Sequence, residues 1–185
     1  MSADDSYGQV PDRRKPEFKA LVDEYYAPLY RFAMSLSRSE SDASDLVQDV
    51  FLLWANKGHR LHDPSKAKAW LFTSLHRAFL QQRRRTVHFP QIEISIAEKE
   101  LPTVPPAAVS DLDSESVLQL LARVDRQYQA TVALFYLEDY TYEQIATVLE
   151  LPLGTVKSRI SRGLAQLRSL ALRRVIRPLP GRREL

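Results

Sequence analysis

Cations and small polar side chains gather in the segment 155–162, and these are the residues of the chain best suited to chemistry with a polyanion. Lysine and arginine bind phosphate oxygens, and arginine, serine and threonine also donate to base edges in a DNA groove. We predict base-edge contacts from three residues on the polar side of the segment: Ser158, Ser161 and Arg162. Phosphate contacts are predicted from three others: Thr155, Lys157 and Arg159.

The element that must position these residues begins with a short helix after Thr141. Thr141 is a candidate N-cap, and Glu143 or Gln144 stands near the third helical position of a capping box. An apolar stripe at helical spacing follows, made of Ile145, Ala146, Val148 and Leu149. The stripe predicts that one face of this helix is buried.

A turn and a second helix follow. Pro152 has no amide proton to continue a helix, Gly154 relaxes the turn, and Thr155 can cap the second helix. The second helix returns apolar residues to one face: Val156, Ile160, Leu164 and Leu167. This pattern predicts a helix-turn-helix whose second helix enters a major groove. The alternative is an amphipathic hairpin with a solvated basic face, but caps, turn and charge together favour DNA binding.

A second set of cations lies in the predicted helix 66–85, which has six Lys or Arg and no acid. Aromatic residues are interleaved with them: Trp70, Phe72 and Phe79. Cations with exposed rings bind single-stranded nucleic acid, because every base offers a face for stacking. The alternative is that the apolar side chains are core and the cations are solvated. We favour the core for Leu71 and Leu75, and both interpretations stay open for Trp70.

The residue types give no support to enzymatic chemistry. The chain has no cysteine, which excludes disulfides, thiolate metal sites and thiol catalysis. His59 and His62 lie three apart in a predicted loop without an acid pairing typical of a metal site. No phosphate-binding glycine loop or nucleophile motif is present. We therefore expect no catalytic residue, no metal, no cofactor and no small-molecule substrate.

Charge is distributed unevenly along the 185 residues, although the net charge is only +3. Residues 141–185 carry nine Lys or Arg against three acids, whereas 86–117 carry six acids and one lysine. This asymmetry indicates a polyanionic partner for part of the chain. The absence of cysteine fits a reducing compartment, and neither a membrane-spanning apolar run nor a signal-peptide core is present. We expect a cytoplasmic protein.

Helical periodicity without convincing strand alternation predicts an all-α fold of two small helical domains joined by an acidic, proline-containing linker. Pro28 should kink or break the first helix, 17–37. The predicted organisation is, in order, a mobile leader at 1–16, an N-terminal helical domain at 17–85, a linker at 86–113, a C-terminal helix-turn-helix domain at 114–170 and a basic tail at 171–185.

Five short strings stand in a specific order along the chain: DASDLVQDVF at 42–51, WLF at 70–72, RRR at 83–85, YEQIA at 142–146 and PLGTVKSRI at 152–160. The first three resemble conserved region 2, and the last two region 4, of the sigma-70 superfamily of bacterial transcription initiation factors. The resemblance is to the small extracytoplasmic-function (ECF) type. Ser44 departs from the family pattern, which usually has an acid at that position.

The resemblance implies that the chain binds core RNA polymerase and directs it to promoters. The helix at 42–55 would dock on the coiled coil of the β′ subunit through Asp45, Gln48 and Asp49, and the β flap is a further implied contact. The helix after Pro152 would read the −35 element as duplex DNA. The −10 element would be read as a melted strand by ten residues: His59, Arg60, His62, Lys66, Lys68, Trp70, Arg77, Arg83, Arg84 and Arg85. The family also implies an anti-sigma factor as a partner.

Two other functions remain open from the residues alone. The first is a helix-turn-helix transcription regulator that binds duplex DNA without polymerase, and the second is a helical adaptor that binds only protein. The cationic helix 66–85 separates the three, since a regulator does not need it and an adaptor needs neither basic helix.

Overall fold

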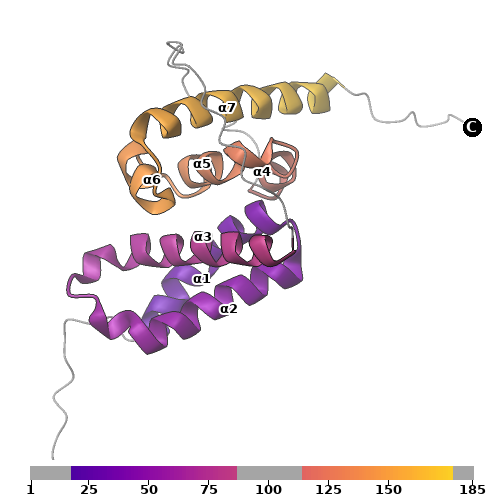
Figure 1. Ribbon diagram of the computed structural model, residues 1–185. Helices are drawn as coiled ribbons and strands as arrows, with labels where there is room; N and C mark the ends of the chain where they lie inside the picture. Colours follow the sequence, from indigo (N-terminus) through magenta and orange to yellow (C-terminus); the bar gives the residue numbers. More distant parts are fainter. Residues whose placement is uncertain (1–17, 87–113, 177–185) are drawn as a thin grey trace, which may run out of the picture.

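Helices account for all regular structure in the part of the chain that the computed structural model describes, residues 18–86 and 114–176. The predicted all-α fold is confirmed. The described helices form two blocks, an N-terminal block of α1–α3 and a C-terminal block of α4–α7 (Figure 1). The leader predicted at 1–16, the linker after residue 86 and the tail from residue 177 lie outside the described residues.

The N-terminal block consists of three mutually packed helices. Its elements are α1 (Phe18–Ser37), α2 (Glu40–Lys57), the 3-10 turns η1 (Gly58–Arg60) and η2 (Pro64–Lys66), and α3 (Ala67–Thr86). Apolar side chains at helical spacing fill the space between the helices, where burial removes their surface from water. The largest fully buried members are Leu21, Leu29, Phe32, Leu71, Phe72 and Leu75. Leu71 and Leu75 are core residues, as predicted.

The first helix runs unbroken through Pro28. Of the kink or break predicted at Pro28, the break is therefore wrong, and the kink stays a prediction. Proline lacks the amide proton that an interior helical position would donate. Leu21 and Leu29 are both fully buried, one before the proline and one beside it. We attribute the continuity of α1 to this burial, which holds the helix against the block on both sides of Pro28.

The second helix begins at Glu40, two residues earlier than the pattern predicted. Ser39 is its N-cap, and the hydroxyl oxygen of Ser39 accepts a hydrogen bond from the Asp42 amide at 3.3 Å. Glu40 and Asp42 lie in the first turn, where the helix dipole favours negative charge.

The C-terminal block contains α4 (Ser114–Leu121), α5 (Arg126–Leu137), α6 (Tyr142–Leu149) and α7 (Leu153–Ile176). Helix α7 crosses α5 so closely at Gly163 that a Cβ there would overlap the Val132 side chain and lie 3.0 Å from the Cβ of Tyr128. Glycine is required at this crossing because no side chain fits between the two helices.

The two blocks are stacked on each other, with α1 and α3 facing helices α4, α5 and α6 (Figure 1). Helix α7 lies on the outer side of the C-terminal block in this view. The rings of Phe72 and Tyr140 meet across the boundary with centroids 5.4 Å apart. Two segments separated by the 27 residues of 87–113 are thus in direct contact.

Candidate nucleic-acid interface

The helix-turn-helix begins with a complete capping box at Thr141. The Thr141 hydroxyl accepts from the Gln144 amide at 3.3 Å, and the Thr141 amide donates to Gln144 Oε1 at 2.8 Å. Both predicted features, the N-cap and the box, are confirmed, with Gln144 and not Glu143 as the second member. Helix α6 then buries Ile145, Val148 and Leu149.

The turn between α6 and α7 depends on a left-handed residue that the pattern did not predict. Glu150 has φ 56° and ψ 45°, and the Leu151 amide donates to the Ala146 carbonyl at 3.0 Å. Gly154 has no positive φ, so its predicted role in relaxing the turn is wrong. The reversal is complete before Gly154, which already lies in α7.

The predicted cap of the second helix is also wrong. Helix α7 begins at Leu153, and the Val156 amide donates to the Pro152 carbonyl at 3.1 Å. Thr155 therefore stands inside the first turn of α7. The fixed φ of Pro152 suits the start of a helix, which explains why the helix begins earlier than a threonine cap would allow.

The faces of α7 agree with the predicted pattern. The apolar stripe is buried: Val156, Ile160, Leu164 and Leu167. Lys157 is exposed, whereas Ser158, Ser161 and Arg162 are partly exposed on the side away from the stripe. The Ser158 hydroxyl donates to the Thr155 carbonyl at 3.0 Å, which leaves its oxygen able to accept. This side of α7 is therefore polar and carries one cation, Arg162.

Arg159 differs from the other −35 candidates because it lies on the flank of α7 and is only partly exposed. Burial lowers the pKa of its guanidinium, and nearby Tyr128 opposes the change. Arginine stays charged in spite of such a change. Arg159 is thus a cation held at the side of the helix, which suits a phosphate better than a base.

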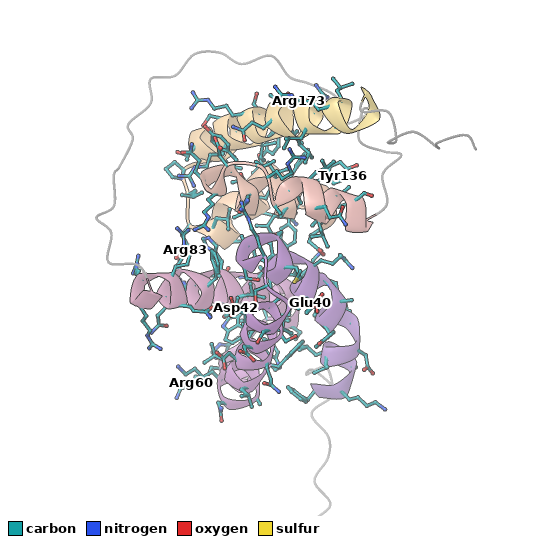
Figure 2. The ribbon with its side chains drawn as sticks, turned by 90° about the vertical axis from the view of Figure 1, so that its right-hand side faces the viewer. Glu40, Asp42, Arg60, Arg83, Tyr136 and Arg173 are labelled. Carbon is teal, nitrogen blue, oxygen red and sulfur yellow. The ribbon has the colours of Figure 1, made fainter. Side chains whose placement is uncertain are left out.

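The −10 candidates before α3 are largely exposed. Arg60, His62 and Lys66 are exposed. Arg60 lies in the N-terminal block, at the end of the molecule opposite to Arg173 of α7 (Figure 2). Asp63 caps η2, since its carboxylate accepts from the Ser65 amide at 3.0 Å and from the Ser65 hydroxyl at 2.7 Å. These bonds lower the pKa of Asp63. The side chain of His59 lies outside the described part.

Trp70 is partly buried against a second tryptophan. Its ring meets Trp54 edge-on, with centroids 5.1 Å apart and planes at 74°. Gly58 makes room for this pair, because a Cβ at Gly58 would lie 2.7 Å from the Trp54 ring. Trp70 is therefore a packing residue with part of its ring still accessible, and only that part is available to a base.

The cations of α3 fall into two groups. Arg83 lies over the Phe79 ring at 5.7 Å, and Arg84 and Arg85 are exposed near the end of the helix. Lys68 and Arg77 instead meet the C-terminal block. Lys68 donates to the Glu138 carbonyl at 3.4 Å, and Arg77 Nε donates to Glu150 Oε2 at 3.3 Å.

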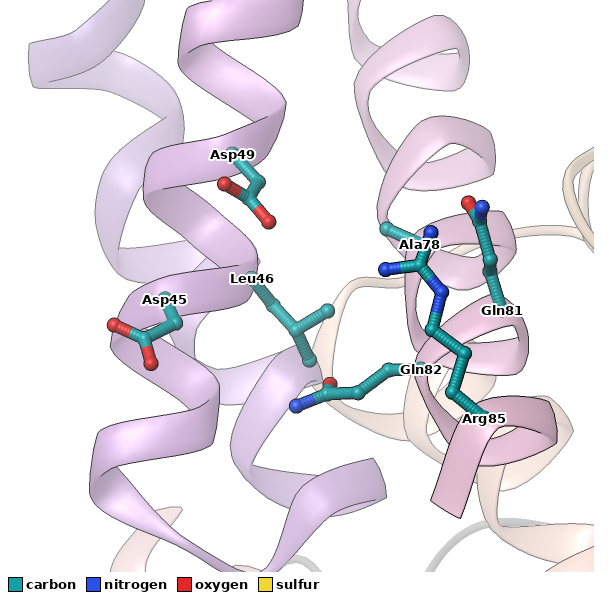
Figure 3. Close-up of a pocket in the computed structure, with 7 residues that line it drawn as sticks. All are labelled: Asp45, Leu46, Asp49, Ala78, Gln81, Gln82 and Arg85. Carbon is teal, nitrogen blue, oxygen red and sulfur yellow. The ribbon is translucent and has the colours of Figure 1, made fainter. Parts of the chain in front are cut away.

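The predicted polymerase-binding residues lie on the exposed face of α2, between two grooves. Asp45 and Asp49 line a polar groove of about 290 Å³ (Figure 3). Its opposite wall comes from α3 and includes Gln81 and Arg85. Gln48 lines the other groove, which runs between α1 and α2.

The second groove contains exposed apolar residues that the sequence pattern did not reveal. Phe18, Tyr26 and Leu52 are 49%, 47% and 59% exposed. The sequence signal for this exposed apolar surface is Leu52, an apolar residue that falls outside the buried stripe of α2. Ser44 also lines this groove, so the position that departs from the family pattern has apolar neighbours.

The described residues contain no group of three His, Asp or Glu side chains that could hold a metal ion. None of their helices is both long and apolar enough to cross a membrane.

Comparison with known proteins gives matches over both blocks. Residues 21–88 match Sigma-70 region 2, and residues 114–167 match Sigma-70 region 4. The ECF RNA polymerase sigma factor SigL of Mycobacterium tuberculosis is 31% identical over 153 residues, covering 81% of this chain and 86% of SigL. The RNA polymerase sigma factor YlaC of Bacillus subtilis is 26% identical, covering 84% and 92%.

A solved structure is also similar. The sigma factor RpoE from Bartonella quintana, in complex with the anti-sigma factor NepR, superposes with a TM-score of 0.66 and 29% identity, covering 86% of this chain and 98% of RpoE. The chain therefore belongs to the sigma-70 superfamily as a sigma factor of the ECF type. Core RNA polymerase and promoter DNA are the partners that membership implies.

Proposed function

We propose that this sigma factor reads the −35 element with the polar face of α7, reads the melted −10 strand with α3 and the turns before it, and docks on polymerase through α2. One observation carries the proposal: cations stand on two separate helices, α3 and α7, while α2 presents exposed acids. A duplex-binding regulator has no use for the cations of α3, and a protein adaptor has no use for either cationic helix.

The −35 assignment is supported by the exposure of α7. Ser158, Ser161 and Arg162 share the side away from the core, where a major groove would receive the helix. Arginine donates two hydrogen bonds to guanine, and serine reads several bases. Thr155, Lys157 and Arg159 lie around this side and are assigned to phosphates, which set the register of the helix on DNA.

The −10 assignment is supported by exposed cations at two places in the N-terminal block. Arg60, His62 and Lys66 occupy the segment before α3, and Arg84 and Arg85 its far end. Single-stranded DNA has both phosphates and open base faces, so cations combined with a partly accessible Trp70 suit a melted strand.

The polymerase assignment is supported by the two grooves beside α2. Asp45 and Asp49 offer carboxylates to arginine side chains of a partner helix, such as the coiled coil of the β′ subunit. Phe18 and Leu52 add apolar surface next to Gln48. By analogy with RpoE bound to NepR, an anti-sigma factor is a second proposed partner. The β flap, a contact that the resemblance to the family implies, is proposed as the site for the C-terminal block.

Reconstituted transcription tests the proposal. Core polymerase alone initiates without promoter selection, whereas core polymerase with this chain is expected to select start sites that share −35 and −10 sequences from a promoter library. The double variant Ser158→Ala/Arg162→Ala should change the selected −35 sequences and leave the −10 sequences unaltered. No selection by the wild-type chain would contradict the proposal. The polymerase catalyses RNA synthesis, and this chain acts in the same cellular compartment as the polymerase.

A further inference from the structure

A carboxylate of the C-terminal block is buried against the N-terminal block. The Glu138 side chain is 3% exposed, and its Oε1 accepts from Arg31 of α1 at 3.1 Å. The Arg31 side chain is 33% exposed. Burial raises the pKa of Glu138, although Arg31 and Lys68 oppose the rise. A buried carboxylate is tolerated only with a partner, so the position of α1 and that of Glu138 depend on each other.

The loop between α5 and α6, which contains Glu138, also contacts Lys68, a predicted −10 contact. Lys68 of α3 donates to the Glu138 carbonyl at 3.4 Å, and its ammonium lies 4.6 Å from the centroid of the Tyr140 ring. Tyr140 also packs on Phe72 of α3. Lys68 is only partly exposed as a result, and a DNA strand would compete with Glu138 and Tyr140 for it.

A second contact engages candidates from both blocks. Arg77 of α3 pairs with Glu150, the left-handed residue of the helix-turn-helix. His76 is partly buried near Glu150 and Arg159, and burial lowers the pKa of His76 to about 4. Arg77 and Glu150 are both more than half exposed, so their pair contributes little to closure by itself. The pair nevertheless places the Glu150 carboxylate against Arg77, which is a −10 candidate.

The boundary contains one feature that a permanent core avoids. The Tyr140 hydroxyl is buried without a hydrogen-bond partner among the described residues. Water would hydrogen-bond to this hydroxyl if the blocks separated, so the unsatisfied hydroxyl disfavours the closed arrangement. Closure is therefore a balance between this penalty and the contacts that favour it, which include Phe72 on Tyr140 and the Arg31–Glu138 pair.

We propose that Arg31, Lys68, Glu138 and Tyr140 form a latch that holds the free protein in a closed, self-inhibited state, in which the C-terminal block engages Lys68 and Arg77 of α3 and withholds them from the −10 strand. The inference rests on the proposed function of α3. Binding to polymerase and promoter favours the open state. Because only open molecules bind, the apparent affinity for polymerase equals the affinity of the open state multiplied by the fraction of molecules that are open. The inhibitor in this device is the chain's own C-terminal block.

Energy transfer between two dyes tests closure in the free, full-length protein. The chain has no cysteine, so cysteines introduced at the exposed positions Ser41 and Ser169 place one dye on each block. Glu138→Arg sets like charges against Arg31 and Lys68 and should shift the population from high to low transfer. The double variant Arg31→Glu/Glu138→Arg restores an opposite pair and should return it toward high transfer.

The control is Glu143→Arg, the same charge change at an exposed position of α6, which should transfer like the wild type. Glu138→Gln is a milder variant, should Glu138→Arg impair folding, and should give an intermediate shift. Equal transfer in the wild type, Glu138→Gln and a folded Glu138→Arg would overturn the latch.

Titration with core polymerase tests inhibition separately. Glu138→Arg should bind core polymerase with an apparent affinity roughly tenfold higher than the wild type. If the wild type binds core and Glu138→Arg binds no more tightly, the latch does not inhibit, and the proposed function stands. If neither protein binds core, the proposed function fails and the inhibitory role falls with it, while energy transfer still reports whether the latch closes.

Discussion

Arg162 and Lys157 belong to the same helix but project from different sides of it, and their surroundings assign them different tasks. Arg162 lies away from the buried stripe, in the direction of the groove, and Lys157 is exposed on the flank. Base contacts carry sequence information, whereas phosphate contacts do not.

Arg162→Ala should therefore reduce binding to the preferred −35 duplex by about 1–3 kcal/mol and relax the preference at one position. Lys157→Ala should weaken all duplexes alike and reduce the slope of log affinity against log salt by about one. Fluorescence anisotropy with a set of duplexes at several salt concentrations measures both effects, and each variant serves as the control for the other. Identical sequence profiles and salt slopes would contradict the assignment.

His76 makes stability depend on pH. Burial lowers its pKa to about 4, with Glu150 opposing this change and Arg159 adding to it, compared with 6.5 in an unfolded chain. Between these values the unfolded state binds more protons than the folded state, so the stability contributed by neutral His76 is present above pH 6.5 and is lost toward pH 4.

Urea unfolding should show that the wild type loses about 2 kcal/mol more between pH 7 and pH 5 than His76→Gln does. His62→Gln is the matched control, since His62 is exposed, and it should follow the wild type. Parallel pH profiles for His76→Gln and the wild type would show that His76 is hydrated and titrates normally.

At the scale of the elements, the crossing of α5 and α7 depends on Gly163. Gly163→Ala introduces a methyl group into space that Val132 and Tyr128 already occupy, and we expect a loss of about 1–3 kcal/mol or more in the free energy of unfolding. Gly154→Ala makes the same change at an exposed position of α7 and should be neutral or slightly stabilising. Chemical denaturation compares the two, and equal stability would mean that the helices separate without penalty.

Helix α2 gives a prediction about polymerase. Asp49→Lys reverses a charge on an exposed face and should weaken core binding by tenfold or more, while circular dichroism remains unchanged. Glu143→Lys is the matched control on α6. Ser44→Ala should have a smaller effect, since serine supplies only a neutral hydrogen bond. Unchanged affinity for Asp49→Lys in a pull-down would remove α2 from the docking surface.

The elements also show what local pattern predicts well. The buried stripe of α7 and the capping box of α6 were predicted because both depend on residues three or four apart. The start of α7 was not, because Pro152 and not Thr155 stands at the start of the helix, and the reversal before it depends on the left-handed conformation of Glu150, which no residue type signals. The continuity of α1 depends on burial against other helices, which outweighs the local effect of Pro28.

At the scale of the whole molecule, contacts between distant residues were beyond the reach of sequence patterns. Arg31 and Glu138 are 107 residues apart, and neither belongs to a motif. Trp70 was left undecided because its environment depends on Trp54, 16 positions earlier, and on the space left by Gly58. The function could be inferred since it rests on contiguous motifs, whereas the closed arrangement rests on packing between the blocks.

Permanganate reactivity of thymines around the −10 element tests most directly whether one chain both docks on polymerase and opens the promoter. The wild type with core polymerase should make these thymines reactive on a double-stranded promoter. The triple variant Arg60→Ala/His62→Ala/Lys66→Ala changes only exposed side chains. It should lower the reactivity severalfold and leave binding to the −35 duplex unchanged. Wild-type reactivity in this variant, or no reactive thymine with the wild-type protein, would contradict the account.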